Sequence, residues 1–172
     1  MQYYYDSIDN SYMVPMMLQK TYKKINDPCT YSQNIPLEIK LIREAVSDEK
    51  YDQMFYDYLI SITPTQENKD IILGIRNDEM KHFGLLRQIY FDLVGEMIST
   101  VQNSEFAMPA SYSQGLQNAM TRELGAIEKN RKILFALKCK KHINMIMEII
   151  SDELKHVNLY TVLNSKYACH ND

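Results

Sequence analysis

Two short stretches decide the fold: "DEMKH" at residues 78–82 and "DELKH" at residues 152–156. Each reads Asp-Glu-x-Lys-His, so each has a Glu and a His three residues apart. Residues at this spacing share one face of a helix, and each stretch therefore presents a Glu–His pair on one side. The meaning of the repeat depends on whether that side faces the core or the solvent.

Both Glu–His pairs lie on the apolar side of a helical pattern. Alternating steps of three and four residues, the spacing of a packed helical seam, give a nearly continuous apolar stripe through each stretch. The first stripe consists of Ile72, Ile75, Glu79, His82, Leu86, Ile89, Leu93 and Met97. The second stripe consists of Ile146, Ile149, Glu153, His156, Tyr160 and Leu163. Both pairs are thus predicted to face the core.

Two further helical patterns carry a glutamate in the same setting. The pattern that begins after Pro36 has the seam Leu37, Leu41, Glu44, Asp48, Tyr51, Phe55, Tyr58 and Ile62. The pattern near the middle of the chain has the seam Leu116, Met120, Glu123, Ile127, Asn130, Leu134 and Leu137. Glu49 is predicted to lie off the seam. All four stripes therefore contain one glutamate among apolar residues.

These patterns predict an all-α protein, because no strand pattern competes with them. The predicted helices occupy residues 37–62, 65–98, 113–137 and 142–166. The chain divides into a Tyr- and Met-rich arm at 1–35, a helical bundle at 36–167 and a short tail at 168–172. The linker between the second and third helices is long enough to return the second helix pair in pseudo-twofold relation to the first.

Composition excludes several classes of protein. The net charge is −3, which does not indicate a nucleic-acid surface. No run of 18 apolar residues predicts a membrane span, and the N-terminus does not read as a signal peptide. The cysteines are Cys29, Cys139 and Cys169, an odd number without a CxxC motif, which argues against a disulfide framework and a zinc ribbon. We expect Cys139 and Cys169 to be ordinary thiols and a reducing cytoplasm to be the simplest compartment.

Four glutamates and two histidines in a core need a counter-charge, because buried carboxylates near one another repel strongly. Two divalent cations supply a charge of +4, which balances four carboxylates beside two neutral imidazoles. Carboxylate and imidazole ligands suit iron and manganese, and no cysteine lies on a seam to favour a thiolate site. A single Glu from two helices and a Glu-x-x-His from the other two is the ligand pattern of dinuclear metal bundles.

The sequence resembles the ferritin-like superfamily over residues 37–166, and its rubrerythrin-related branch in particular. The stretch "YDYLISITPTQENKDIILGIRNDEMKHFGLLRQIYFDLVG" resembles stand-alone rubrerythrin-like proteins of spore-forming bacteria. This resemblance implies a ferritin-like antiparallel four-helix bundle with a long crossover between helices two and three. It implies two terminal glutamates, two bridging glutamates and two histidines as metal ligands, which are Glu44 and Glu123, Glu79 and Glu153, and His82 and His156. Asp78 and Asp152 are expected to accept the outer N–H of a histidine from another helix.

The sequence departs from that family in three ways. Rubrerythrins carry a further ligand glutamate three residues after the third-helix glutamate, where this chain has Ala126. They also carry a rubredoxin domain, which is missing here, so a separate electron donor such as a rubredoxin-like protein or a reductase is expected. Met80 follows Glu79 as the haem-ligating Met does in bacterioferritin, but the arm and helix spacing do not resemble a cage subunit, and haem is not expected.

The expected function is that of a non-haem di-iron or di-manganese oxidoreductase that reduces H2O2 or O2. The alternatives are a ferroxidase or iron-handling protein, a spore-associated structural protein with a metal-stapled bundle, and a hydroxylase of an organic substrate. A homodimer in the cytoplasm, or associated with the spore, is expected. Tyr51 reads as core packing or as a redox-active tyrosine, and Asp48 as a satisfied polar residue or an extra carboxylate near the metals.

Overall fold

The computed structural model describes residues 37–47, 49–98 and 106–168, without the side chains of 49, 50 and 168. This part of the chain is an all-α helical bundle with no strand, which confirms the predicted fold class. The helices are α1 (Leu37–Val46), α2 (Glu49–Ser61), α3 (Gln66–Val94), α4 (Tyr112–Ala136) and α5 (Lys140–Ala168). The predicted N-terminal arm lies outside the described residues.

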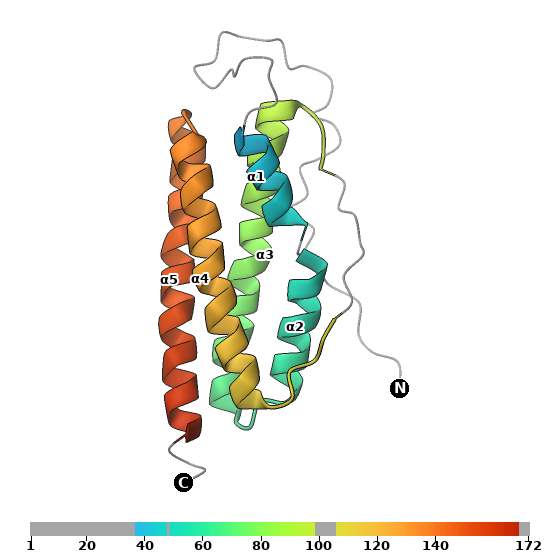
Figure 1. Cartoon of the computed structure of the whole chain (residues 1–172), viewed down its shortest axis with the longest axis vertical. Coiled ribbons are helices and arrows are strands. Elements are labelled where there is room, and N and C mark those ends of the chain that lie inside the picture. Colours follow the sequence, from blue (N-terminus) through green and yellow to red (C-terminus); the bar gives the residue numbers. More distant parts are fainter. Residues whose placement is uncertain (1–36, 48, 99–105, 169–172) are drawn as a thin grey trace.

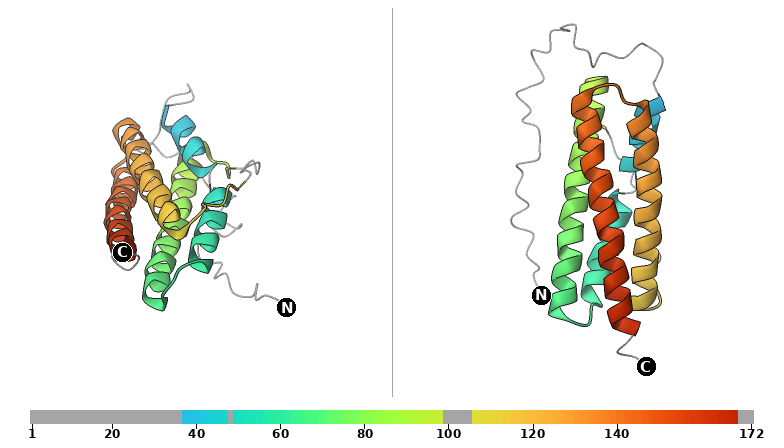
Figure 2. Two further views of the ribbon diagram at one scale, coloured as in Figure 1. Left: turned by 60° about the horizontal axis from the view of Figure 1, so that its bottom comes forward. Right: turned by 90° about the vertical axis from the view of Figure 1, so that its left-hand side faces the viewer.

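The helices form an elongated bundle in which α3, α4 and α5 run the full length (Figure 1). Helices α1 and α2 follow one another along the same side and together take the place of one long helix (Figures 1 and 2). Helices α3 and α4 run in one direction, whereas α1, α2 and α5 run in the other. The end of α3 and the beginning of α4 therefore lie at opposite ends of the bundle, which requires the long crossover that the sequence predicts.

Local signals fix the ends of α3 and the beginning of α4. The Thr65 side chain accepts a hydrogen bond from the backbone N–H of Asn68, and Gly95 ends α3 with a positive φ of 80°. The Ser111 side chain accepts from the backbone N–H of Gln114 and caps α4. Helix α4 thus begins at Tyr112, one residue before the predicted start at residue 113.

The first predicted helix differs most from the structure, because it is two helices with a turn at Ser47 between them. Helix α1 buries Glu38, Ile42 and Val46, so its inward face is offset by one residue from the predicted seam. The predicted seam residue Leu37 is 62% exposed. A seam stepped through one uninterrupted helix loses its phase where the helix breaks, and the placement of Glu44 on that seam is wrong.

The core consists of two apolar clusters, one towards each end of the bundle. One cluster includes Ile42, Val46, Leu86, Ile89, Tyr90, Ile133, Ile146 and Ile149. The other includes Phe55, Leu59, Ile72, Ile75, Leu116, Tyr160 and Leu163. On α3 and α5 the two Asp-Glu-x-Lys-His stretches fall between these clusters, so the bundle places their polar side chains at its middle, with apolar packing on both sides.

Two expectations from composition have different outcomes. Among the helices that the structure describes, none is long and apolar enough to cross a membrane. Cys139 is buried and disulfide-bonded, which corrects the expectation of an ordinary thiol, and the other two cysteines lie outside the described ranges.

Candidate metal centre

Side chains from three helices meet around the imidazole of His156, which is completely buried in α5. Its Nδ1 atom lies 3.2 Å from Glu79 Oε1 of α3 and 3.6 Å from Glu123 Oε2 of α4. The same atom lies 3.6 Å from Glu153 Oε2, one turn earlier in α5. Ligand atoms of these four residues all lie within 4.8 Å of one another, close enough to hold a metal ion.

His82 of α3 adds a second imidazole to this group. Its Nδ1 atom lies 3.5 Å from Glu79 Oε1 and 3.5 Å from Glu153 Oε1. The rings of His82 and His156 are stacked, with centroids 5.8 Å apart and planes at 29°. We call these five residues, Glu79, His82, Glu123, Glu153 and His156, the Glu/His cluster.

The Nε2 atom of each imidazole contacts the aspartate of the other Asp-Glu-x-Lys-His stretch. His82 Nε2 lies 3.3 Å from Asp152 Oδ2 of α5, and His156 Nε2 lies 3.1 Å from Asp78 Oδ2 of α3. These contacts agree with the expectation that Asp78 and Asp152 each accept the outer N–H of a histidine from another helix. Lys155 Nζ donates to both of them, at 2.7 Å to Asp78 and 2.8 Å to Asp152. Both rings are therefore turned with Nδ1 towards the cluster.

Several inward atoms of the cluster are buried without a hydrogen-bond partner. They are Glu79 Oε1, His82 Nδ1, Glu153 Oε2 and His156 Nδ1. Leaving a buried polar atom unpaired costs about 1–3 kcal/mol, and more for a charged group. Native structures keep few such atoms, so four together indicate that the cluster is built to hold something else. Carboxylate and imidazole atoms together form a donor set that fits a divalent transition metal.

Without a metal, protons on the histidines neutralise part of the cluster. Burial lowers the pKa of His82, but the carboxylates of Glu153 and Glu79 beside its Nδ1 atom outweigh burial and raise the pKa to about 10. Burial likewise lowers the pKa of His156, while Glu123, Glu153 and Glu79 raise it to about 12. Both imidazoles are therefore cationic near neutral pH, and a metal ion must displace their inner protons in order to bind.

A further proton lies on the carboxylates. Burial raises the pKa of Glu123 well above its ordinary value, and the neighbouring Glu153 raises it further. Burial acts the same way on Glu153, but the neighbouring Glu123, His156 and His82 outweigh burial and leave its pKa lowered. The two pKa values therefore move apart, as expected for two carboxylates that lie close enough to share a proton.

The remaining predicted ligand, Glu44, is not part of the Glu/His cluster. Its side chain is 52% exposed and lies 3.9 Å from Lys40 on the outer face of α1. The inward position near the cluster belongs to Ala45, which lines the cavity described below. The side chains of Asp48 and Glu49 lie outside the described ones, so their positions relative to the cluster stay predictions from the sequence.

Helix α2 contributes a tyrosine that the sequence did not single out. The buried Tyr56 hydroxyl donates a hydrogen bond to Glu123 Oε1 at 3.0 Å. Tyr51, the tyrosine considered from the sequence, instead packs edge-on against Phe106 and beneath the guanidinium of Arg122. Tyr56 directly follows the predicted seam residue Phe55, and α2 buries both side chains.

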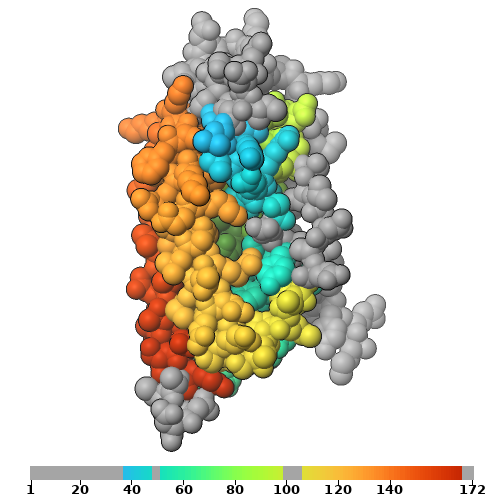
Figure 3. Space-filling view, in the orientation of Figure 1, coloured from blue at the N-terminus to red at the C-terminus, as the bar shows by residue number. Residues whose placement is uncertain are grey.

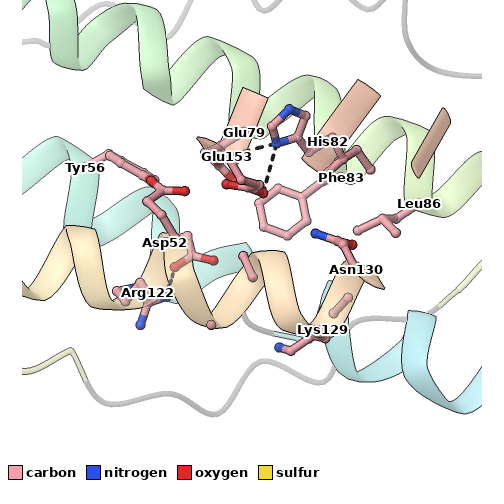
Figure 4. Close-up of a pocket in the computed structure, with 15 residues that line it drawn as sticks. Asp52, Tyr56, Glu79, His82, Phe83, Leu86, Arg122, Lys129, Asn130 and Glu153 are labelled. Carbon is pink, nitrogen blue, oxygen red and sulfur yellow. Dashed lines mark hydrogen bonds and ion pairs between the residues drawn. The ribbon is translucent and has the colours of Figure 1, made fainter. Parts of the chain in front are cut away.

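A cavity of about 250 Å³ lies beside the cluster (Figure 4). Glu79, His82, Glu123 and Glu153 line one part of it, and Phe83, Leu86, Ile149 and Asn130 line another. Asp52 and Arg122, which form an ion pair, lie on the α2 and α4 sides of the cavity. Figure 3 shows a hollow between α4 and the α1–α2 side, with α3 visible behind it.

Comparison of the chain with protein-family models gave no match, and comparisons with curated proteins and with solved structures gave none either. The likeness to the ferritin-like superfamily and its rubrerythrin-related branch therefore stays a prediction from the sequence motifs. The bundle and the Glu/His cluster stand on the geometry alone.

Proposed function

We propose that the Glu/His cluster binds two divalent metal ions, iron or manganese, and that the protein is a non-haem oxidoreductase acting on H2O2 or O2. The observation that carries the proposal is the set of buried, unpaired ligand atoms at the middle of the bundle. The carboxylate–imidazole donor set suits both metals, and selectivity between them often follows availability.

The charge of the cluster fits two metals when one further carboxylate joins it. Its three glutamates supply three negative charges against the four positive charges of two divalent ions. Asp52 of α2 lines the cavity and is only 17% exposed, so it is one source of the fourth carboxylate. Glu49 is another by sequence spacing, because steps of three and four back from Tyr56 within α2 reach Gln53 and Glu49.

The protein's own groups prepare the site for redox chemistry, which the metals would supply as single-electron changes at each ion. Glu79 and Glu153 each contact both imidazoles and, together with them, would hold the metals. Tyr56 holds Glu123 by its hydroxyl, and the aspartates fix the orientation of both imidazoles. Electrons for repeated turnover come from a separate donor.

The test is anaerobic loading with Fe(II), followed by near-ultraviolet absorbance after addition of H2O2 or of air. The proposal expects about two irons per chain. With at least one of the two oxidants, the absorbance should change faster for the protein-bound iron than for free iron in the same buffer. A faster change with peroxide indicates a peroxidase, and a faster change with O2 indicates a ferroxidase or oxygenase. Absence of bound iron, or iron that neither oxidant changes faster than free iron, would overturn it.

Matched variants make the test specific to the cluster. Glu153→Gln removes a central carboxylate and should abolish binding of the metal pair, whereas Glu44→Gln, on the outer face of α1, should leave the stoichiometry unchanged. Asp52→Asn and Glu49→Gln then identify the fourth carboxylate, because only loss of the true ligand lowers the metal content.

A further inference from the structure

We propose that the outer face shared by α4 and α5 is the interface of a homodimer, in which each of these helices packs in the opposite direction against the same helix of a second copy. This inference goes beyond the proposed function, because the dimer needs no metal. It assigns a surface to the homodimer that is expected from the sequence.

Helix α4 presents an exposed stripe with an apolar residue at each end and two opposite charges between them. Leu124 is 53% exposed, and Phe135, at 78%, is the most exposed large apolar side chain that the structure describes. Glu128 and Arg131 lie between them and are also exposed. Steps of four, three and four residues keep all four side chains on one side of the helix. Large apolar side chains gathered on one face indicate contact with another protein surface.

Helix α5 continues this face. Met147 and Leu154 are each about half exposed and lie seven residues apart, so they share one side of α5. Thr161, seven residues after Leu154, donates to the sulfur of Met120, which lies four residues before Leu124 on α4. Leu154 and Leu124 therefore border the same contact between α4 and α5 from its outer side. Figure 2 shows these two helices side by side along the bundle.

The stripe on α4 is complementary to itself. Leu124 and Phe135 lie at equal distances on either side of the midpoint between residues 129 and 130, and so do Glu128 and Arg131. A two-fold axis that crosses the helix at this midpoint brings Leu124 against Phe135 of the second copy and Glu128 against Arg131 of the second copy. Each apolar residue then meets an apolar residue and each charge meets its opposite, which favours a second copy as the partner.

Two contacts between α4 and α5 indicate which of their residues lie at the same height. Ser113 Oγ donates to Asn164 Oδ1 at 3.1 Å, and Thr161 Oγ1 donates to Met120 Sδ at 3.5 Å. Because the two helices run in opposite directions, counting on from these contacts places the midpoint of the α4 stripe level with about residue 150 of α5.

The same two-fold axis therefore also pairs the apolar residues of α5. Met147 and Leu154 lie at equal distances on either side of the midpoint between residues 150 and 151, which is close to the height of the axis on α4. An axis that runs across both helices brings Met147 against Leu154 of the second copy. One symmetry operation thus matches the exposed residues of both helices, and this agreement carries the proposal.

The proposed interface lies away from the Glu/His cluster. On α4 the cavity beside the cluster is lined by Glu123, Ala126 and Asn130 among others, and neither Leu124 nor Phe135 lines it. The cavity reaches the side of α4 that faces α1 and α2, whereas the stripe borders α5. Dimerisation would therefore leave the approach to the cluster open in both copies.

The experiment is sedimentation equilibrium of the full-length protein in a reducing buffer, at concentrations up to about 100 µM, a range that detects dimers of moderate affinity. The wild type should sediment with twice the mass of one chain. Leu124→Asp and Phe135→Asp, both at exposed positions, should each weaken the dimer by about a hundredfold or more, because each places a charge against an apolar residue. The control Met108→Asp, at a residue that is 68% exposed outside the face, should remain dimeric.

Two outcomes of this experiment would overturn the proposal. A monomeric wild type would mean that residues outside the described ranges, or a different protein, cover the face. A dimer that persists unchanged in both Leu124→Asp and Phe135→Asp would place the interface elsewhere. Far-ultraviolet circular dichroism confirms that the variants are folded, and Leu154→Asp on α5 replaces any variant that is not.

A charge exchange tests the antiparallel register itself. Glu128→Arg and Arg131→Glu each bring like charges together across the two-fold axis and should each weaken the dimer about tenfold or more. The double variant Glu128→Arg/Arg131→Glu restores opposite charges at both positions and should recover most of the affinity. A double variant that dimerises no better than the single variants would contradict the proposed pairing.

Discussion

Both imidazoles of the cluster have carboxylates on their two sides. His156 has Glu79, Glu123 and Glu153 at Nδ1 and Asp78 at Nε2, a setting that keeps the ring doubly protonated when no metal is bound. The carboxylates that would bind metal therefore hold protons in the metal-free protein. Protons and metals compete for the same atoms, so pH affects both stability and metal binding.

The metal-free protein should lose stability as pH rises from about neutral to 10. The pKa values of His82 and His156 are raised from 6.5 to about 10 and about 12, so between pH 6.5 and 10 the folded state holds protons that the unfolded chain has released. This stabilisation is complete below pH 6.5 and is lost as pH rises through the folded pKa values.

Urea unfolding of the chelator-treated protein at pH 6.5 and pH 9 measures this change. The free energy of unfolding should be lower at pH 9, and in His82→Gln/His156→Gln the difference should shrink. An equal or higher free energy at pH 9 in the wild type would show that the two histidines are not protonated within the cluster.

The two Asp-Glu-x-Lys-His elements are not equivalent. Lys155 of the second stretch donates to both Asp78 and Asp152, the residues that hold the two histidines. Lys81 of the first stretch instead pairs with Glu148 on the outer surface of α5. Lys155 therefore contacts both aspartates that hold the imidazoles, whereas Lys81, at the same position of the first stretch, only joins α3 to α5.

Lys155→Met should weaken metal binding by about threefold to tenfold, less than the ~10–100-fold expected when a direct partner of a metal-bound histidine is removed. Lys81→Met should leave affinity unchanged, although each variant loses a surface pair worth about 0–1 kcal/mol. Titration with Co(II), whose visible spectrum reports ligand geometry, measures the effect.

Lys155→Arg should restore most of the affinity, since a guanidinium can also reach two carboxylates. Equal Co(II) affinities and spectra for the Lys155→Met and Lys81→Met variants would mean that Lys155 acts only as a surface ion pair.

Sequence periodicity predicted the buried face of the continuous helices, but not that of the first predicted helix, which is divided into α1 and α2. On α5, every predicted seam residue from Ile146 to Leu163 is buried. On the first helix the break at Ser47 shifts the register, so Glu44 was placed inward and Tyr56 was missed. A seam pattern cannot show a break when apolar residues allow two registers.

At the scale of the whole molecule, the two apolar clusters keep the bundle folded while its middle remains polar. The α3–α5 side of the Glu/His cluster is covered by Asp78, Lys155 and Asp152, and the cavity reaches the α1–α2 and α4 side (Figures 3 and 4). Small molecules would therefore approach the cluster between α4 and the α1–α2 pair.

The most direct test of a dinuclear centre is the metal stoichiometry of the metal-free protein after equilibrium dialysis against Fe(II) or Mn(II) without oxygen. The wild type and Glu44→Gln should each bind about two ions per chain. The double variant Glu79→Ala/Glu153→Ala should not bind the metal pair. No bound metal in the wild type, or two ions retained by the double variant, would contradict the assignment of the Glu/His cluster as a metal centre.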